Sequence, residues 1–246
     1  MFRVCFVVLL AWVLFPWPTA VTAQNPAPPS AGAPASRQAP APAVERLGPN
    51  LYRIGRMQVD TAKREVTVPG RLNPVTTLEF VACTRGGMKA YESALTLETD
   101  GVTFNTALLL IGLDKTHARV PERHFDPVPP AGDPVEIWIE WSGSGAMPGG
   151  RVPAEQLLFN QRTKQTVAVT SWVYTGSTTL PTGAYLADRD GVLIGFVHSP
   201  APVIESVGGP GVGNYGDIVL NPNLRLAPLA PVMLTIRALK PATGGR

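Results

Sequence analysis

The sequence has little of the residue types on which many functions depend. Its 246 residues include two cysteines, three histidines and only 16% charged residues. Cys5 lies in an N-terminal segment that we expect to be removed, which leaves Cys83 in the mature chain. One thiol excludes an intramolecular disulfide and the four thiolates that an iron–sulfur cluster usually needs. Packing alone must therefore hold the fold together, which is feasible for a domain of this size.

Clustered positive charge is also missing. The formal net charge is +3, but four of the arginines and one acid, Glu45, lie outside the range 51–240, and within that range the two signs are equal in number. A nucleic-acid-binding domain is expected to gather Lys and Arg on one face. We therefore expect no nucleic-acid partner.

Catalytic and nucleotide-binding motifs are absent or lack their context. The H-E-x-x-H, P-loop and G-x-S-x-G patterns do not occur. Gly211–Gly216 matches G-x-G-x-x-G, but that motif requires a helix to follow it. The next residues, 217–220, are typical of a brief strand, and Pro222 ends it. We therefore reject a dinucleotide site and interpret 206–216 as a flexible loop.

The N-terminus has the three parts of a secretory signal. A positive start at Arg3 precedes an apolar run over 4–15, then prolines, then small residues up to Ala23. A membrane-spanning helix needs about 20 apolar residues, more than this run offers. We predict a signal peptide over 1–23 with cleavage after Ala23, export to the periplasm, the cell envelope or the medium, and no transmembrane helix in the mature chain.

Composition divides the remainder into a linker and one domain. Residues 24–49 are rich in Pro and Ala and have few charges, which predicts an extended, semi-rigid spacer. Docking of its prolines on an aromatic groove is the less favoured alternative. From Leu51 to Lys240 the sequence has the apolar runs of a globular domain, which we place at 51–240.

Short apolar runs between turn residues predict strands in this domain. Val135–Trp141 is the clearest, because its apolar residues alternate with Glu136, Trp138 and Glu140. A hairpin is expected from 57–60 and 65–68 around the turn 61–64. Further strands are expected at 78–84, 167–174, 192–197 and 232–239. The fold class is therefore α+β: a β-rich domain of mostly short antiparallel strands with one or two short helices.

Two segments follow a helical period instead. Phe104, Ala107, Leu108 and Ile111 have the i, i+3, i+4, i+7 spacing of a helix face, with Asp100 or Thr103 to cap the start and Gly112 to end it. Leu109 and Leu110 widen the apolar surface, so we expect this helix to be buried against the sheet. The range 153–159, which begins with a proline, is a second and shorter candidate.

One polar constellation suggests chemistry. Cys83, Lys89, Tyr91, Glu92 and Ser93 flank a Gly-Gly loop. A thiol activated by a nearby Lys could act as a nucleophile, with Glu92 moving protons. The alternative, which we favour, is that Cys83 packs in a strand while Lys89 and Glu92 pair across a turn, because cysteine is often buried and no base such as His is adjacent.

The histidines suggest at most a weak metal site. His117 and His124 occur near Glu122 and Asp126, but seven-residue spacing in a Pro-containing loop is not a known ligand pattern. We interpret them as surface histidines, give His198 at a strand end no special role, and predict neither a metal nor a cofactor.

The order of these segments resembles the YdjY-like domain family of bacteria, over roughly 51–239. The resemblance rests on 78–83, 89–93, 107–112, 129–132 with 140–141, and 172–177. In that family a His commonly stands where this chain has Tyr91, so a histidine-based role at this position is not expected. Some members are described as ferredoxin-like, which the single mature cysteine argues against. The family implies no established activity.

Two functional hypotheses are compatible with the sequence. The favoured one is an exported binding or structural module of the cell envelope, whose partner is an envelope protein or a small molecule. The alternative is a hydrolase or acyl-transfer enzyme that uses Cys83, Lys89, Glu92 and Ser93. The first requires a buried Cys83, and the second requires these four side chains to meet at a pocket.

Overall fold

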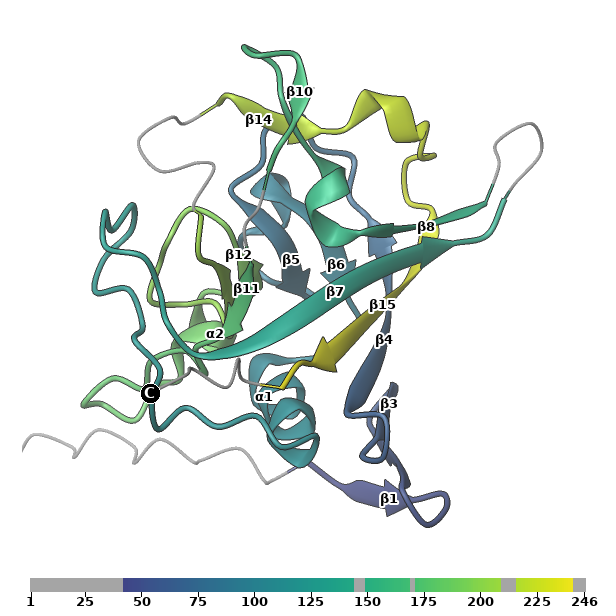
Figure 1. Ribbon diagram of the computed structural model, residues 1–246, viewed down its shortest axis with the longest axis vertical. Coiled ribbons are helices and arrows are strands. Elements are labelled where there is room, and N and C mark those ends of the chain that lie inside the picture. The colour runs from purple at the N-terminus through teal and green to yellow at the C-terminus, as the bar shows by residue number, and fades with distance from the viewer. Residues whose placement is uncertain (1–41, 144–148, 169–170, 209–215, 241–246) are drawn as a thin grey trace, which may run out of the picture. The chain divides into compact units, whose positions relative to one another are not determined.

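Short strands dominate the chain. A computed structural model describes residues 42–143, 149–168, 171–208 and 216–240 (Figure 1). The helices of the described residues are α1 (Gly101–Leu110), α2 (Leu186–Arg189) and the 3₁₀ helices η1 (Ala90–Glu92), η2 (Ala154–Leu157) and η3 (Pro222–Leu224). Most strand pairs are antiparallel. The predicted α+β, β-rich fold is confirmed.

The strands form two sheets. The larger sheet contains β1 (Val44–Arg46), β2 (Leu51–Ile54), β3 (Met57–Asp60), β4 (Glu65–Leu72), β5 (Phe80–Thr84), β6 (Ser93–Leu97), β7 (Asp133–Trp141), β8 (Gly150–Pro153), β11 (Trp172–Tyr174), β12 (Val192–Gly195), β13 (Ile204–Ser206) and β15 (Pro231–Ala238). The smaller sheet contains β9 (Leu158–Asn160), β10 (Gln165–Thr166) and β14 (Ile218–Leu220), in the order β10-β9-β14. In the view of Figure 1, β10 and β14 lie above the larger sheet.

The larger sheet closes on itself. The pairings run from β4 through β15, β7, β11, β13, β12, β5 and β6, and β6 pairs with β4 again. Such a ring leaves no open edge between its members, and its inward side chains fill the interior. β1, β2 and β3 extend the sheet from β4, and β8 pairs with β7.

Alternation along β7 and β15 builds the core, as the sequence predicts. Leu234 lies opposite Ile139 on β7 and opposite Val68 on β4, and all three side chains are buried. Burial of each such side chain contributes about 1.5–3 kcal/mol. On the other face, Arg237 pairs with Glu65 and Glu136. A shift of one residue in register would exchange these two faces, so the pattern fixes the register.

The N-terminal strands include the predicted hairpin. β3 and β4 pair antiparallel around the turn 61–64, where Arg64 has φ = 58°. The sheet also begins earlier than the domain range predicted from the sequence, because β1, which lies in the segment interpreted as linker, pairs with β2. The remainder of the predicted linker up to residue 41, and the predicted signal peptide, lie outside the described residues.

Helix α1 starts three residues before the predicted range and has the predicted N-cap. Asp100 Oδ1 accepts a hydrogen bond from Thr103 N at 2.7 Å, and Phe104 and Leu108 are buried. The expectation that Leu109 and Leu110 are buried as well is wrong, since they are 47% and 40% exposed. They follow Leu108 on the side of the helix that faces away from the core.

Two other expectations need correction. The predicted helix over 153–159 is only the single turn η2, because the strands β8 and β9 occupy its two ends. The strand predicted over 167–174 is observed as β11 alone, and residues 169–170 lie outside the described part. Within the described residues, no helix has the length and apolar character needed to span a bilayer.

Candidate functional site

Cys83 lies in the interior, in strand β5. Its side chain is fully buried, and its Sγ donates to Leu95 O at 3.4 Å and lies 3.4 Å from Thr96 Oγ1. Asn73 completes this group, since its Oδ1 accepts from Thr96 Oγ1 at 2.8 Å and its Nδ2 donates to Ser93 O at 2.9 Å. Cys83 therefore belongs to a buried polar group that joins β5 to β6.

Lys89 and Glu92 form an ion pair across η1, since Lys89 precedes the turn and Glu92 ends it. Residues three apart stand on the same side of a 3₁₀ turn, and Lys89 Nζ lies 2.5 Å from Glu92 Oε1. Partial burial alone would lower the pKa of Lys89. The hydrogen bonds from its ammonium to Glu92 and to the Tyr91 hydroxyl outweigh that effect and raise the pKa above its usual value. Lys89 is thus a fixed cation.

Ser93 supports this turn rather than presenting a nucleophile. It is fully buried, and its hydroxyl donates to Lys89 O at 2.7 Å. The structure therefore brings Lys89, Glu92 and Ser93 together, while the thiol of Cys83 bonds Leu95 and Thr96 and reaches this turn only through Asn73. The four-residue arrangement that a nucleophilic thiol would need is not formed.

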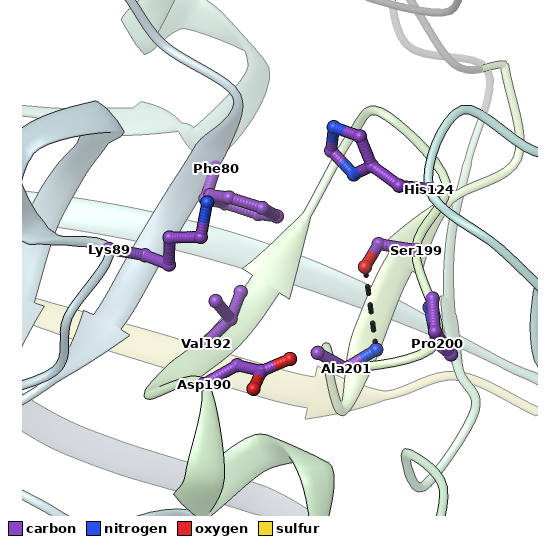
Figure 2. A pocket seen from close by; sticks show the side chains of 8 residues that line it. All are labelled: Phe80, Lys89, His124, Asp190, Val192, Ser199, Pro200 and Ala201. Atoms are coloured by element: carbon purple, nitrogen blue, oxygen red, sulfur yellow. Dashed lines mark hydrogen bonds between the residues drawn. The ribbon is translucent and has the colours of Figure 1, made fainter. Parts of the chain in front are cut away.

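Lys89 faces a cleft that sequence reasoning did not find. The cleft has a volume of about 250 Å³ and is lined by Phe80, Lys89, His124, Asp190, Val192 and the segment 199–201. Figure 2 shows Phe80 and Lys89 on one side and His124 and Ser199 on the other, with Asp190 and Val192 below. Segments far apart in sequence thus supply a cation, an imidazole and apolar surface to one hollow.

His124 repeats the arrangement of Lys89. Its Nε2 lies 3.4 Å from Glu79 Oε2, and the side chains of His124 and Glu79 are 42% and 6% exposed. The backbone joins the two acids, because Glu79 N donates to Glu92 O at 2.9 Å. Lys89 and His124 are therefore each paired with a carboxylate that is more buried than they are.

Asp190 is the acidic residue of the cleft lining. It follows α2, and both of its carboxylate oxygens accept from Arg189, at 2.6 Å from Nε to Oδ1 and 3.0 Å from Nη2 to Oδ2. Both oxygens of the Asp190 carboxylate are therefore already hydrogen-bonded to the adjacent Arg189.

The wall formed by 199–201 belongs to the connection between the parallel strands β12 and β13. Glu205 of β13 is fully buried, and its Oε1 accepts from Ser199 N at 3.0 Å. Gly195 makes room for it, since a Cβ there would lie 2.6 Å from Glu205 Oε1. Glu205 thus anchors one end of the wall.

Burial governs the protonation of Glu205. Removal from water raises the pKa of its carboxyl to about 8, although hydrogen bonds from the backbone amides of Ser199, His198 and Ser206 act in the opposite direction. Its Oε2 has no hydrogen-bond partner among the described residues. The folded protein therefore favours the neutral acid up to about neutral pH.

His198 is a buried connector, which corrects its interpretation as an unremarkable strand-end residue. It is 3% exposed, and its Nδ1 and Nε2 lie 2.9 Å from Asp126 O and 3.0 Å from Ser206 O. It thereby ties the loop that carries His124 to strand β13. A φ of 58° at His198 turns the chain there.

The residues considered for a metal have other roles. Asp126 accepts from Val128 N at 3.0 Å and from Glu122 N at 2.8 Å, and these amides lower the pKa of its carboxyl. His117 is exposed. Across the described ranges, no group of three or more His, Cys, Asp or Glu residues is arranged to hold a metal ion.

The glycine-rich pattern at 211–216 is described only at its last residue, and the flexible loop predicted over 206–216 is described only at its two ends. The chain beyond the pattern forms the strand β14, after which Pro222 begins the single turn η3. The absence of a long helix after the pattern, which the sequence predicts, is confirmed.

Sequence reasoning missed the lining residues Phe80, Asp190 and Ser199, and the buried acids Glu79 and Glu205 that contact the lining. The available signal was weak: Glu79 and Glu205 are acids inside apolar segments, where burial is unusual without a partner or function. No local sequence pattern indicates that the segments that carry Glu79 and Glu205 belong to neighbouring parts of one closed sheet.

The family model of the YdjY domain matches residues 57–205. No curated protein and no solved structure matches the chain. The matched range includes every lining residue of the cleft, from Phe80 to Ala201, and the buried acids Glu79 and Glu205. The resemblance inferred from the order of motifs is confirmed: the chain belongs to the YdjY domain family.

Proposed function

We propose that this protein is an exported binding module of the cell envelope, and that its YdjY domain binds a small molecule in the cleft between Lys89 and His124. The observation that carries the binding role is the cleft itself, which combines apolar surface with two bases from separate segments. Apolar pockets with a few convergent polar groups are typical of small-molecule sites. A volume of about 250 Å³ is suited to a ligand smaller than a typical drug.

Binding is favoured over catalysis because of the position of the thiol. Cys83, the nucleophile of the alternative hypothesis, is sealed in the core, and Ser93 is turned toward the Lys89 carbonyl. The groups that face the cleft are held by neighbouring side chains. Such fixed groups are pre-organised for recognition.

A fragment screen by ligand-observed NMR tests the binding role. The informative variant is K89M with E92Q, which removes the cation without leaving a buried charge. The matched control is K63M with D60N, since Lys63 and the half-buried Asp60 form a pair with the same three-residue spacing outside the cleft. We expect fragments that bind the wild type and the control but not the cleft variant; equal binding to all three proteins would refute a site in the cleft.

Export is tested separately. The predicted signal over 1–23 requires the mature chain to begin at Gln24. Intact-mass analysis of the protein from the periplasmic fraction of its host should show this species. A full-length chain with Met1 in the cytosol would contradict export and leave the binding proposal standing.

A further inference from the structure

At both ion pairs of the cleft, the nitrogen group is more exposed than the carboxylate paired with it. At Lys89 the side chain is 34% exposed while that of Glu92 is 5% exposed, and at His124 the base is again the outer member of its pair. A ligand that enters the cleft therefore meets the nitrogen atoms, and the carboxylates of Glu79 and Glu92 lie behind them.

The ammonium of Lys89 has capacity for one further partner. Of its three N–H groups, one is directed to Glu92 Oε1 and one to Tyr91 Oη, at 3.3 Å. The raised pKa keeps the group charged. A third hydrogen bond from this ammonium to an anionic acceptor would be charge-assisted and stronger than a bond to a neutral one.

The acidic group of the lining offers little to a cationic ligand. Asp190 accepts from Arg189 through both oxygens, so a ligand ammonium would have to compete with a guanidinium already in place. The apolar lining consists of Phe80, Val192, Pro200 and Ala201, of which Phe80 and Val192 are 2% and 1% exposed and form the floor rather than the rim. The Lys89 ammonium lies 6.0 Å from the centre of the Phe80 ring, so charge and apolar surface are adjacent.

From this arrangement we infer that the ligand is a small organic anion, with a carboxylate directed at Lys89 and His124 and an apolar group against Phe80 and Val192. This inference rests on the proposed function and specifies the ligand class for the same cleft. Neutral or cationic analogues of the same shape lack the negative charge that the Lys89 ammonium favours.

Three probes of similar shape and different head group test the ligand class. Benzoate, benzamide and benzylamine are titrated into uniformly ¹⁵N-labelled mature protein, and affinities are taken from amide shift changes. We expect benzoate to bind about tenfold more tightly than benzamide, because both can accept a hydrogen bond from the Lys89 ammonium but only the carboxylate adds the attraction of opposite charges. Benzylamine should bind most weakly.

The cleft variant and its control locate the effect. K89M with E92Q should reduce benzoate affinity about tenfold, and should reduce benzamide affinity by a smaller factor, because benzamide loses a hydrogen bond but no attraction between opposite charges. K63M with D60N should change neither. Circular dichroism and the amide spectrum establish that both double variants are folded. The single substitution H124Q should also weaken benzoate binding.

The outcomes separate the two proposals. If benzamide or benzylamine binds in the cleft as tightly as benzoate, the anion inference is overturned and the binding role stands. If benzoate binds but the amides whose shifts change all lie outside the cleft, the anion inference is also overturned. If no probe and no screened fragment binds the cleft, both proposals fail.

Discussion

Glu205 gives the sharpest prediction for stability. Its carboxyl is fully buried, and its pKa is raised from an ordinary value of 4.5 to about 8. The folded state binds the proton of Glu205 more tightly than the unfolded state does. The resulting stabilisation of the folded state is fully present below about pH 4.5 and is lost as the pH rises through 8. Each pKa unit corresponds to about 1.4 kcal/mol, so this group lowers the free energy of unfolding by roughly 3 kcal/mol between pH 4 and pH 7.

The substitution E205Q isolates that contribution. Gln keeps a carbonyl oxygen for the Ser199 amide and cannot ionise. We expect the difference in unfolding free energy, E205Q minus wild type, to increase by roughly 3 kcal/mol from pH 4 to pH 7 and to level off above pH 8.

Urea unfolding followed by tryptophan fluorescence at a series of pH values measures this difference. E140Q serves as the matched control, because Glu140 is also a strand glutamate but lies on the exposed face of β7. Parallel pH profiles for wild type and E205Q, or a difference that shrinks as the pH rises, would refute the assignment of a buried neutral acid.

Three further predictions concern the core and the helix. Native Cys83 should react with a thiol reagent only as fast as the protein opens, because the sulfur is buried; rapid labelling without denaturant would contradict this. L234A should lower the free energy of unfolding by about 2–5 kcal/mol in urea, since Leu234 packs between β4 and β7, whereas M233A on the exposed face should cost much less. D100A should cost about 1 kcal/mol through loss of the cap on Thr103 N, and D100N, which keeps an acceptor, should recover most of it.

Sequence patterns predicted the local structure well where one periodicity dominated. The alternation at 135–141 and 232–239 gave both strands and their buried faces, and the spacing of Phe104 and Leu108 gave the buried face of α1. The width of the buried helix face was predicted less well. Leu109 and Leu110 are apolar yet exposed, since hydrophobicity alone does not set the width of a buried helix face.

The cleft was beyond local reasoning because it depends on long-range pairing. The Lys89–Glu92 pair was expected from its spacing in sequence, but the cleft also needs β5 beside β12, and the loop of His124 held by His198. Parallel β12 and β13 are joined by a short connection, although parallel strands usually need a crossover of a dozen residues or more. No periodicity in 192–206 indicates that Glu205 is buried beneath that connection.

The central claim is that the cleft beside Lys89 is a binding site for a small anion. Mapping the amide shift changes caused by benzoate on the wild-type protein tests it most directly. The account predicts that the largest saturable changes occur at the residues around the cleft, notably Phe80, His124, Val192 and Ala201. Changes that do not saturate, or that centre on the outer face of β7 and β15, would contradict it.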